Sequence, residues 1–269
     1  MVSLIVQQKQ IKKGSRTLDR NYGKWFLNTV KRTIIKYAMI KEGDNLALGV
    51  SGGKDSSALL YIMSLVQLHA PFPFSMQAVF VDMGWEMDIA PLRDLCLRLQ
   101  IPFFVEKTHI SRIVFEVRKE KNPCSLCAKL RRGALHKAAK NLGCNRVALG
   151  HHLDDALETF FLNLFYSGTM GTFKPHTYLD RRDLYLIRPL ICLREKVIVS
   201  LVKKENLPSI ENPCPVAGKT KRGEMGEIVD FIALRYPFLY ERFLTSLEKS
   251  GIWPLKPYFV GDDLKSPNT

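Results

Sequence analysis

The stretch Leu46-Ala47-Leu48-Gly49-Val50-Ser51-Gly52-Gly53-Lys54-Asp55-Ser56 decides the fold, because it joins an apolar run to a glycine turn. The apolar run predicts a buried strand that ends at the turn, and helical spacing follows from Ser56 to Leu68. Adjacent glycines let backbone N–H groups crowd around an anion, and the positive end of the helix dipole adds to that attraction. The sequence therefore predicts a phosphate-binding loop over residues 51–56.

The rest of the chain alternates strands with helices. Apolar runs predict further strands at residues 76–81, 102–105, 146–149 and 184–187. Helical spacing occurs at residues 25–40, 89–99, 128–142, 153–165 and 195–205. This alternation predicts an α/β fold with a doubly wound, mostly parallel sheet flanked by helices. Ligands of such sheets bind beyond the carboxyl ends of the strands, so the glycine loop, Asp82 and Gly150-His151-His152 should face one crevice.

The glycine loop fits neither the G-x-x-x-x-G-K-[ST] pattern nor G-x-G-x-x-G. A plain strand-to-helix turn is the alternative. The run Ser51 to Ser56 resembles the PP-loop of the N-type ATP pyrophosphatases, which split ATP between the α and β phosphates and adenylate a carbonyl oxygen. The resemblance implies an adenine nucleotide alpha hydrolase-like fold. It also implies a set of ATP-binding residues: Ser51, Gly52, Gly53, Lys54, Asp55, Ser56, Val81 and Asp82, with Lys54 and Asp55 also catalytic.

We expect three segments in chain order. Residues 1–40 form a basic arm and a helix, and residues 41–207 form the PP-loop ATP-binding catalytic domain. Residues 208–269 hold a proline-rich loop around Cys214 and then helices between Glu224 and Leu247.

A second motif follows the strand at 146–149 and reads Gly150-His151-His152-Leu153-Asp154-Asp155-Ala156-Leu157-Glu158-Thr159. Asp154 and Asp155 fall in the first turn of a helix, where carboxylates either cap the helix or bind Mg²⁺ on ATP phosphates. The motif resembles that of PP-loop enzymes that modify tRNA. The resemblance implies that Gly150, His151, Asp154 and Asp155 bind the nucleotide and its metal, with Asp155 catalytic.

Three of the six cysteines are candidate ligands. Cys124 and Cys127 stand at a helix start, where thiolates are stabilised, and Cys214 offers a third thiolate between two prolines. C-x-x-C alone is compatible with zinc, redox or cluster roles. Three thiolates can hold a [4Fe-4S] cluster with one open iron, although four is the usual number, and a persulfide on one cysteine is a further alternative. Cys96, Cys144 and Cys192 lie in apolar periodic segments and are expected in the core.

The run Cys124-Ser125-Leu126-Cys127-Ala128-Lys129-Leu130-Arg131-Arg132-Gly133 is similar to the cysteine motif of the tRNA 2-thiocytidine synthetase (TtcA) family. Asn163-Leu164-Phe165-Tyr166-Ser167-Gly168, Ile187-Arg188-Pro189-Leu190 and Arg194-Glu195-Lys196 extend the similarity over residues 25–235. It implies that Cys124, Cys127 and Cys214 hold the cluster, whose fourth iron carries the sulfur. In the best-known members of this family, another cysteine follows a few residues after the one that corresponds to Cys214. This chain has no cysteine there.

The implied reaction is ATP-dependent thiolation of a tRNA pyrimidine, most simply a cytidine of the anticodon loop. The C2 carbonyl oxygen is adenylated and then replaced by sulfur. A 2-thiouridine synthetase and a lysidine-type ligase share the adenylation step, but the former carries extra zinc-finger cysteines and the latter needs no cysteines. A zinc-stabilised RNA-binding module and a small-molecule thiolase are the remaining alternatives.

The charge balance supports a polyanionic partner, because 40 Lys and Arg stand against 26 Asp and Glu, a net charge of +14. We expect Lys129, Arg131 and Arg132, on the cysteine helix, to bind tRNA phosphates. For Phe165 and Tyr166 we favour core packing over stacking on a flipped base.

The sequence lacks an apolar run near the roughly 20 residues that a membrane-spanning helix needs, and Met1 to Ile11 lacks the features of a secretory signal. A cytoplasmic protein with reduced thiols and no membrane partner is expected. A cysteine desulfurase or another sulfur donor is an expected partner, and a homodimer is one possible assembly.

Overall fold

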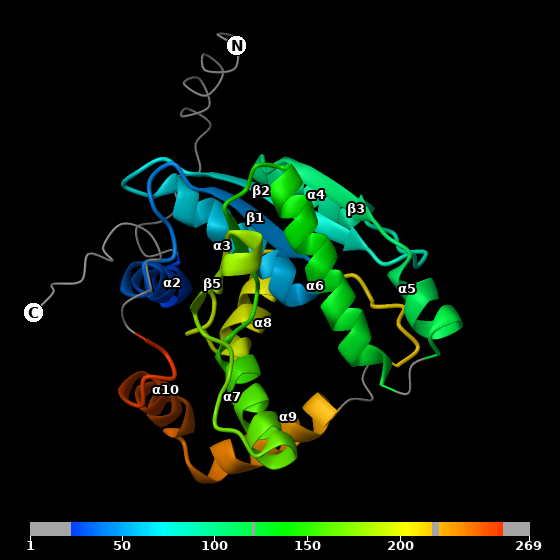
Figure 1. The fold of residues 1–269 in the computed structure, drawn as a ribbon. Coiled ribbons are helices and arrows are strands. Elements are labelled where there is room, and N and C mark those ends of the chain that lie inside the picture. Colours follow the sequence, from blue (N-terminus) through cyan, green and yellow to red (C-terminus); the bar gives the residue numbers. More distant parts are fainter. Residues whose placement is uncertain (1–22, 120–121, 217–220, 255–269) are drawn as a thin grey trace, which may run out of the picture.

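The computed structural model describes residues 23–119, 122–216 and 221–254. At its centre, six described strands form one sheet in the order β3-β2-β1-β4-β6-β5 (Figure 1). The strands are β1 (Asn45–Val50), β2 (Ser75–Asp82), β3 (Phe103–Lys107), β4 (Arg146–Ala148), β5 (His176–Leu179) and β6 (Leu184–Ile187). Only the pair β5–β6 is antiparallel among these described strands. The mostly parallel sheet is confirmed, and β5 is an additional edge strand.

Helices flank the sheet. They are α2 (Lys24–Lys36), α3 (Lys54–Leu68), α4 (Ala90–Leu99), α5 (Ile110–Arg112), α6 (Pro123–Asn141), α7 (Leu153–Leu162), α8 (Glu195–Lys204), α9 (Lys221–Arg235) and α10 (Leu239–Lys249). Short π-helical segments η2 (Ile113–Val117) and η3 (Asn163–Ser167) extend α5 and α7, and η4 (Asp180–Arg182) is a 3-10 turn. No helix within the described ranges is long and apolar enough to cross a membrane.

Helix α6 begins earlier than the apolar spacing predicted. Its first residue is Pro123, so Cys124 and Cys127 lie within the helix and not before it. Proline suits the first helical position, because its fixed φ matches the helix and its missing N–H would have no partner there.

The strand order reverses between β1 and β4. The chain adds β2 and β3 on one side of β1 and then places β4 on the other side. A crevice opens beyond the carboxyl ends of two strands at such a switch point. The loop at residues 51–53 follows β1 and the loop at residues 149–152 follows β4, so this topology brings the two predicted motifs together.

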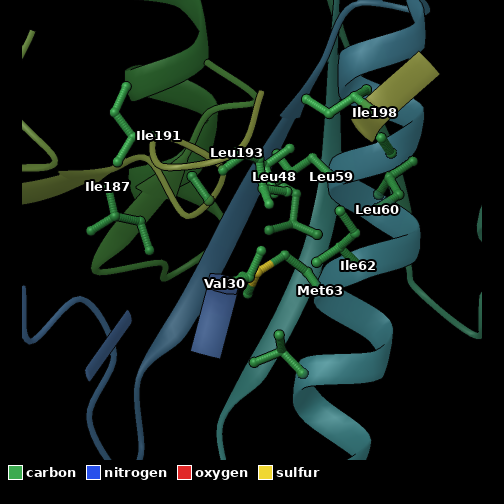
Figure 2. Close-up of a cluster of buried hydrophobic side chains, with 14 of the residues drawn as sticks. Val30, Leu48, Leu59, Leu60, Ile62, Met63, Ile187, Ile191, Leu193 and Ile198 are labelled. Carbon is green, nitrogen blue, oxygen red and sulfur yellow. The ribbon is translucent and has the colours of Figure 1, made fainter. Parts of the chain in front are cut away.

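Each face of the sheet buries its own core, because side chains alternate along the strands. Leu46 and Leu48 of β1 belong to the larger core, and Figure 2 shows Leu48 beside Leu59 and Ile62 of α3. The intervening Ala47 points into a smaller core that α6 covers.

The larger core also includes the ends of the described chain. Helix α2 contributes Phe26 and Val30, and α10 contributes Phe243. Trp253 is fully buried, and its indole Nε1 donates to the carbonyl of Phe173 at 2.9 Å. These helices therefore stabilise the same core as the sheet.

Side chains join the amino ends of β1 and β4. The carboxylate of Asp44 pairs with the guanidinium of Arg146, and both residues are buried. Asp44 also accepts from the side-chain amide of Asn145 at 2.8 Å, and the Asn145 side chain accepts from the backbone N–H of Asn45 at 2.9 Å. This network fixes the register of the two strands that lead to the crevice.

We predict that Asp44→Ala lowers the free energy of unfolding by about 3–5 kcal/mol, because it leaves the Arg146 charge buried without its partner. Urea unfolding followed by circular dichroism measures the change. Glu116→Ala is the matched control, since its pair with Arg112 is exposed and contributes less than about 1 kcal/mol. Equal effects of the two substitutions would contradict the assigned role of Asp44.

Candidate active site

The glycine loop connects β1 to α3 in a conformation that requires glycine. Gly52 has a φ of +88°, and a Cβ there would lie 3.2 Å from Ile210 Cβ. The backbone carbonyl of Gly52 accepts from the N–H of Ile210 at 2.8 Å. The segment before Cys214 is therefore attached directly to the loop.

The N-terminus of α3 has no side-chain cap. Its N-cap is Gly53, which provides no side-chain hydrogen bond to the first turn. The Ser56 hydroxyl donates to the carbonyl of Gly53 at 2.8 Å and so holds the shape of the loop, while Ser51 is exposed beside it. An uncapped helix start with a positive dipole is suited to bind a phosphate.

Lys54 supplies a cation at this helix start. Its Nζ lies 2.8 Å from Glu195 Oε1 and 3.1 Å from Asp55 Oδ2. Burial lowers the pKa of Lys54, but the hydrogen bonds and charges of Glu195 and Asp55 outweigh it, so the pKa stands above its ordinary value. The amine is therefore charged at neutral pH, as neutralisation of a polyphosphate requires.

The loops after β1 and β4 touch at Gly150. A Cβ on Gly150 would lie 2.9 Å from the backbone oxygen of Asp55 and 3.1 Å from its carbonyl carbon. Only glycine allows this approach without a shift of the backbone at the start of α3. The position of the phosphate loop thus depends on a residue almost a hundred positions away.

Helix α7 caps its own N-terminus, unlike α3. The backbone N–H of His152 donates to Asp155 Oδ2 at 3.0 Å, and the N–H of Asp155 donates to His152 Nδ1 at 3.3 Å. Asp155 also lies 3.7 Å from Nη2 of Arg222 in α9. One carboxylate thus both caps α7 and faces α9.

Asp154 points toward α8. Its Oδ2 accepts from the backbone N–H of Glu195 at 2.7 Å, and its Oδ1 pairs with Nε of Arg194 at 3.2 Å. Both carboxylate oxygens are therefore engaged in joining α7 to the start of α8. This geometry favours a positioning role for Asp154.

Asp55 and Asp155 both lie near the same ring nitrogen of His152. The imidazole Nε2 is 3.7 Å from Asp55 Oδ1 and 3.4 Å from Asp155 Oδ2. The Asp55 Oδ1 atom is buried and has no hydrogen-bond partner among the described residues. Two carboxylates beside an uncapped helix start fit the oxygen ligands that Mg²⁺ takes from proteins.

His151 lines the same loop. Its ring stacks on Phe173 with centroids 4.6 Å apart, and its Nδ1 accepts from Nε of Arg188 at 3.1 Å. Burial and then the charge of Arg188 lower the pKa of His151, so the imidazole is neutral.

At the end of β2, backbone atoms rather than side chains are available to a ligand. Val81 is buried in the smaller core, and Asp82 Oδ1 accepts from the N–H of Gly84 at 2.8 Å. A purine at this strand end would meet the main chain of these residues.

One residue of the site, Glu158, was not singled out from the sequence. Glu158 lies one turn after Asp155, on the face of α7 that meets α9, and its Oε2 is 3.2 Å from Arg222 Nε. Burial raises the pKa of Glu158 to about 7, against the opposing charge of Arg222. The three-residue spacing from Asp155 could have revealed Glu158, whereas the pairing of Glu158 with Arg222 is a tertiary contact that no spacing reveals.

The three candidate cysteines share one neighbourhood. Burial raises the pKa of Cys127, Arg131 lowers it, and the thiols of Cys214 and Cys124 raise it further, which places them within electrostatic range. Cys124 is exposed and the other two are half-buried. Three thiols are the type of donor that an iron–sulfur cluster takes. In the described part of the chain, no three His, Cys, Asp or Glu side chains are arranged to hold a single metal ion.

The other cysteines lie in the cores, as expected. Cys96 and Cys144 are buried, and Cys192 is partly buried against the larger core.

Basic side chains lie on α6, the helix that contains Cys124 and Cys127. Lys129, Arg131 and Arg132 on α6 are exposed. Burial lowers the pKa of Arg188, and the charge of Arg132 lowers it further.

The sheet order and the uncapped glycine loop define a PP-loop nucleotide-binding protein. The family model described as the PP-loop domain matches residues 26–223. The tRNA-cytidine(32) 2-sulfurtransferase of Pelobacter propionicus is 38% identical over 226 residues, which cover 82% of this chain and 83% of that protein. The Bordetella pertussis protein of the same name is 39% identical over 213 residues, 77% of this chain and 65% of its own length. The chain therefore belongs to the tRNA-cytidine(32) 2-sulfurtransferase family.

A solved structure supports the fold. The U34-tRNA thiolase NcsA from Methanococcus maripaludis, determined with its [4Fe-4S] cluster, superposes with a TM-score of 0.65. It is 23% identical, and the match covers 82% of this chain and 79% of NcsA. The resemblance to PP-loop enzymes of the TtcA family is confirmed.

We predict that Gly150→Ala weakens ATP binding by about tenfold or more, because the added methyl group pushes against the backbone at the start of α3. Calorimetric titration with a non-hydrolysable ATP analogue measures the affinity. Gly133→Ala in α6 is the matched control, since a Cβ there meets nothing within 4 Å. Unchanged affinity in Gly150→Ala would contradict the assigned contact between the two loops.

Proposed function

We propose that this chain is an ATP-dependent tRNA sulfurtransferase that replaces the O2 atom of cytidine 32 with sulfur. The observation that carries the proposal is the hydrogen bond from the N–H of Ile210 to the carbonyl of Gly52, which attaches the segment before Cys214 to the PP-loop. The names of the family members supply the nucleotide and its position. The net charge of +14 supports a nucleic-acid substrate.

The first step is adenylation. The O2 atom of the cytidine attacks the α-phosphorus of ATP, and the bond to the bridging oxygen breaks with its electron pair leaving on pyrophosphate. Lys54 and the uncapped N–H groups of α3 lie where they would neutralise the leaving pyrophosphate. The adenylated oxygen is then a good leaving group.

The second step forms the C–S bond. A sulfur nucleophile attacks C2, and the C2–O bond breaks with its electron pair leaving on AMP. Cys124, Cys127 and Cys214 would hold a [4Fe-4S] cluster, which would supply an iron site for that sulfur. A cysteine desulfurase or another donor would replenish the sulfur, and a homodimer is the assembly we propose.

Asp55 and Asp155 would hold Mg²⁺, which neutralises phosphate charge as pyrophosphate leaves. His152 Nε2 lies near both carboxylates, 3.7 Å from Asp55 Oδ1 and 3.4 Å from Asp155 Oδ2. Asp154 would act indirectly by fixing α8, and with it Glu195 beside Lys54.

We predict that Asp155→Asn lowers tRNA-dependent AMP formation by about 100-fold, because asparagine still caps α7 but provides no charge for Mg²⁺. Asp154→Asn is the matched comparison. It should lower the melting temperature through the loss of its ion pair with Arg194 and keep AMP formation within about tenfold of the wild type. Loss of AMP formation in Asp154→Asn at an unchanged melting temperature would instead make Asp154 the metal ligand.

The function itself is tested by incubating unmodified tRNA with anaerobically purified protein, ATP, Mg²⁺ and sulfide. We expect 2-thiocytidine at position 32 by mass spectrometry of digested tRNA, and none with Cys214→Ala. Cys144→Ala is the control, because Cys144 is buried in the smaller core and should keep full activity. Thiolated uridine, or full activity of Cys214→Ala, would contradict the proposal.

A further inference from the structure

Two aromatic side chains next to the crevice are exposed. Phe165 is 59% exposed and Tyr166 is 49% exposed, so the expectation that they pack in the core is wrong. Both lie in η3, where α7 widens into a π-helical turn without a buried residue. Such turns turn side chains outward and often occur at functional sites.

The two rings are nevertheless held in place. The Phe165 ring stacks on Phe161, with centroids 5.6 Å apart and an angle of 13° between the planes. The Nζ of Lys221 lies 3.9 Å from the centroid of the Tyr166 ring, and the Tyr166 hydroxyl donates to Glu224 at 3.1 Å. An exposed ring with fixed orientation is a preformed stacking surface, because little side-chain entropy is lost when a planar group binds.

This aromatic surface adjoins the active site. Lys221 is the first residue of α9, and its neighbour Arg222 donates to Thr159 Oγ1 at 2.8 Å and pairs with Glu158 at 3.2 Å. Figure 1 shows α9 crossing the end of α7, where these contacts occur. Lys221 and Arg222, which are adjacent in α9, therefore link the exposed ring of Tyr166 to Glu158, although about three helical turns separate Asp155 from Phe165 along the chain.

The chemistry of the surface selects its ligand. Aromatic faces beside cations bind unpaired nucleotides by stacking and by attraction to the phosphates. A nucleotide that is drawn into a pocket leaves its neighbours unstacked, and a protein ring replaces the lost contact. A second copy of this chain is a poor occupant, because Lys221 and Arg222 would face like charges on a chain with a net charge of +14.

We propose that Phe165, Tyr166 and Lys221 form a stacking site for an unpaired base of the substrate RNA, adjacent to the nucleotide that reacts. The proposal rests on the proposed function for the identity of the RNA. In this proposal, Phe165 and Tyr166 recognise the unpaired loop of the RNA. The residues of the crevice carry out the chemical step.

The test measures the affinity of the full chain for a labelled RNA anticodon stem–loop by fluorescence anisotropy. Tyr166→Leu and Phe165→Leu should each weaken binding by about tenfold, since stacking contributes roughly 1–3 kcal/mol per base. Tyr166→Phe keeps the ring and should bind like the wild type. Phe238→Leu is the control for loss of an exposed ring elsewhere, because Phe238 is 71% exposed at the start of α10.

Salt dependence separates stacking from charge. Tyr166→Leu should leave the slope of log Kd against log salt unchanged, whereas Lys221→Met should reduce it by about one. The molecular mass of each variant is measured by light scattering in the same buffer. Wild-type affinity in both leucine variants would overturn the proposal, and so would a change of mass in Tyr166→Leu, which would make the rings an interface between copies.

The result of this RNA-binding measurement does not depend on whether the protein thiolates tRNA. Ring-dependent RNA binding by a protein that forms no 2-thiocytidine would sustain the stacking site and refute the proposed function. Thiolation with RNA affinity unaffected in the leucine variants would sustain the function and refute the stacking site.

Discussion

The contact between Gly150 and the backbone of Asp55 is the constraint on which the crevice depends. It is possible only because β1 and β4 are neighbours at the point where the strand order reverses, and because residue 150 has no side chain. The contact fixes the start of α3, where the uncapped N–H groups and Lys54 are available to phosphate. The same loop starts α7, whose first turn provides Asp155. One close approach of two backbones therefore sets both the anion site and the carboxylates beside it.

The segment that contains Cys214 is joined to this arrangement by main-chain hydrogen bonding. Ile210 donates to the carbonyl of Gly52, and Cys214 follows four residues later on the same segment. Cys124 and Cys127 lie on a different segment of the chain, in the first turns of α6. Because the smaller core packs α6 against β1 and β4, the distance between the thiols and the phosphate loop is set by the packing of the sheet.

Much of this was predictable from the sequence, and the exceptions have physical reasons. The glycine loop, the alternation of strands and helices and the spacing of the cysteines depend on local patterns, and they predicted the sheet and the family. The edge strand β5 was not predicted, because His176–Leu179 is half-buried and lacks a clear apolar alternation. Asp154 and Asp155 look equivalent in the sequence, yet the start of α8 engages only Asp154. The exposure of Phe165 and Tyr166 depends on a π-helical turn, and apolar residues after a helix give no sign of it. The pairing of Arg222 with α7 is a tertiary contact between distant segments.

The central claim is that one crevice combines a PP-loop with a cluster held by three cysteines. Iron and acid-labile sulfide content, with an absorption spectrum, of protein purified without oxygen tests it most directly. The account predicts about four irons and four sulfides per chain, all lost in Cys124→Ala. Stoichiometric zinc, or protein that contains no metal but thiolates tRNA, would contradict it and would indicate a persulfide on one of the cysteines.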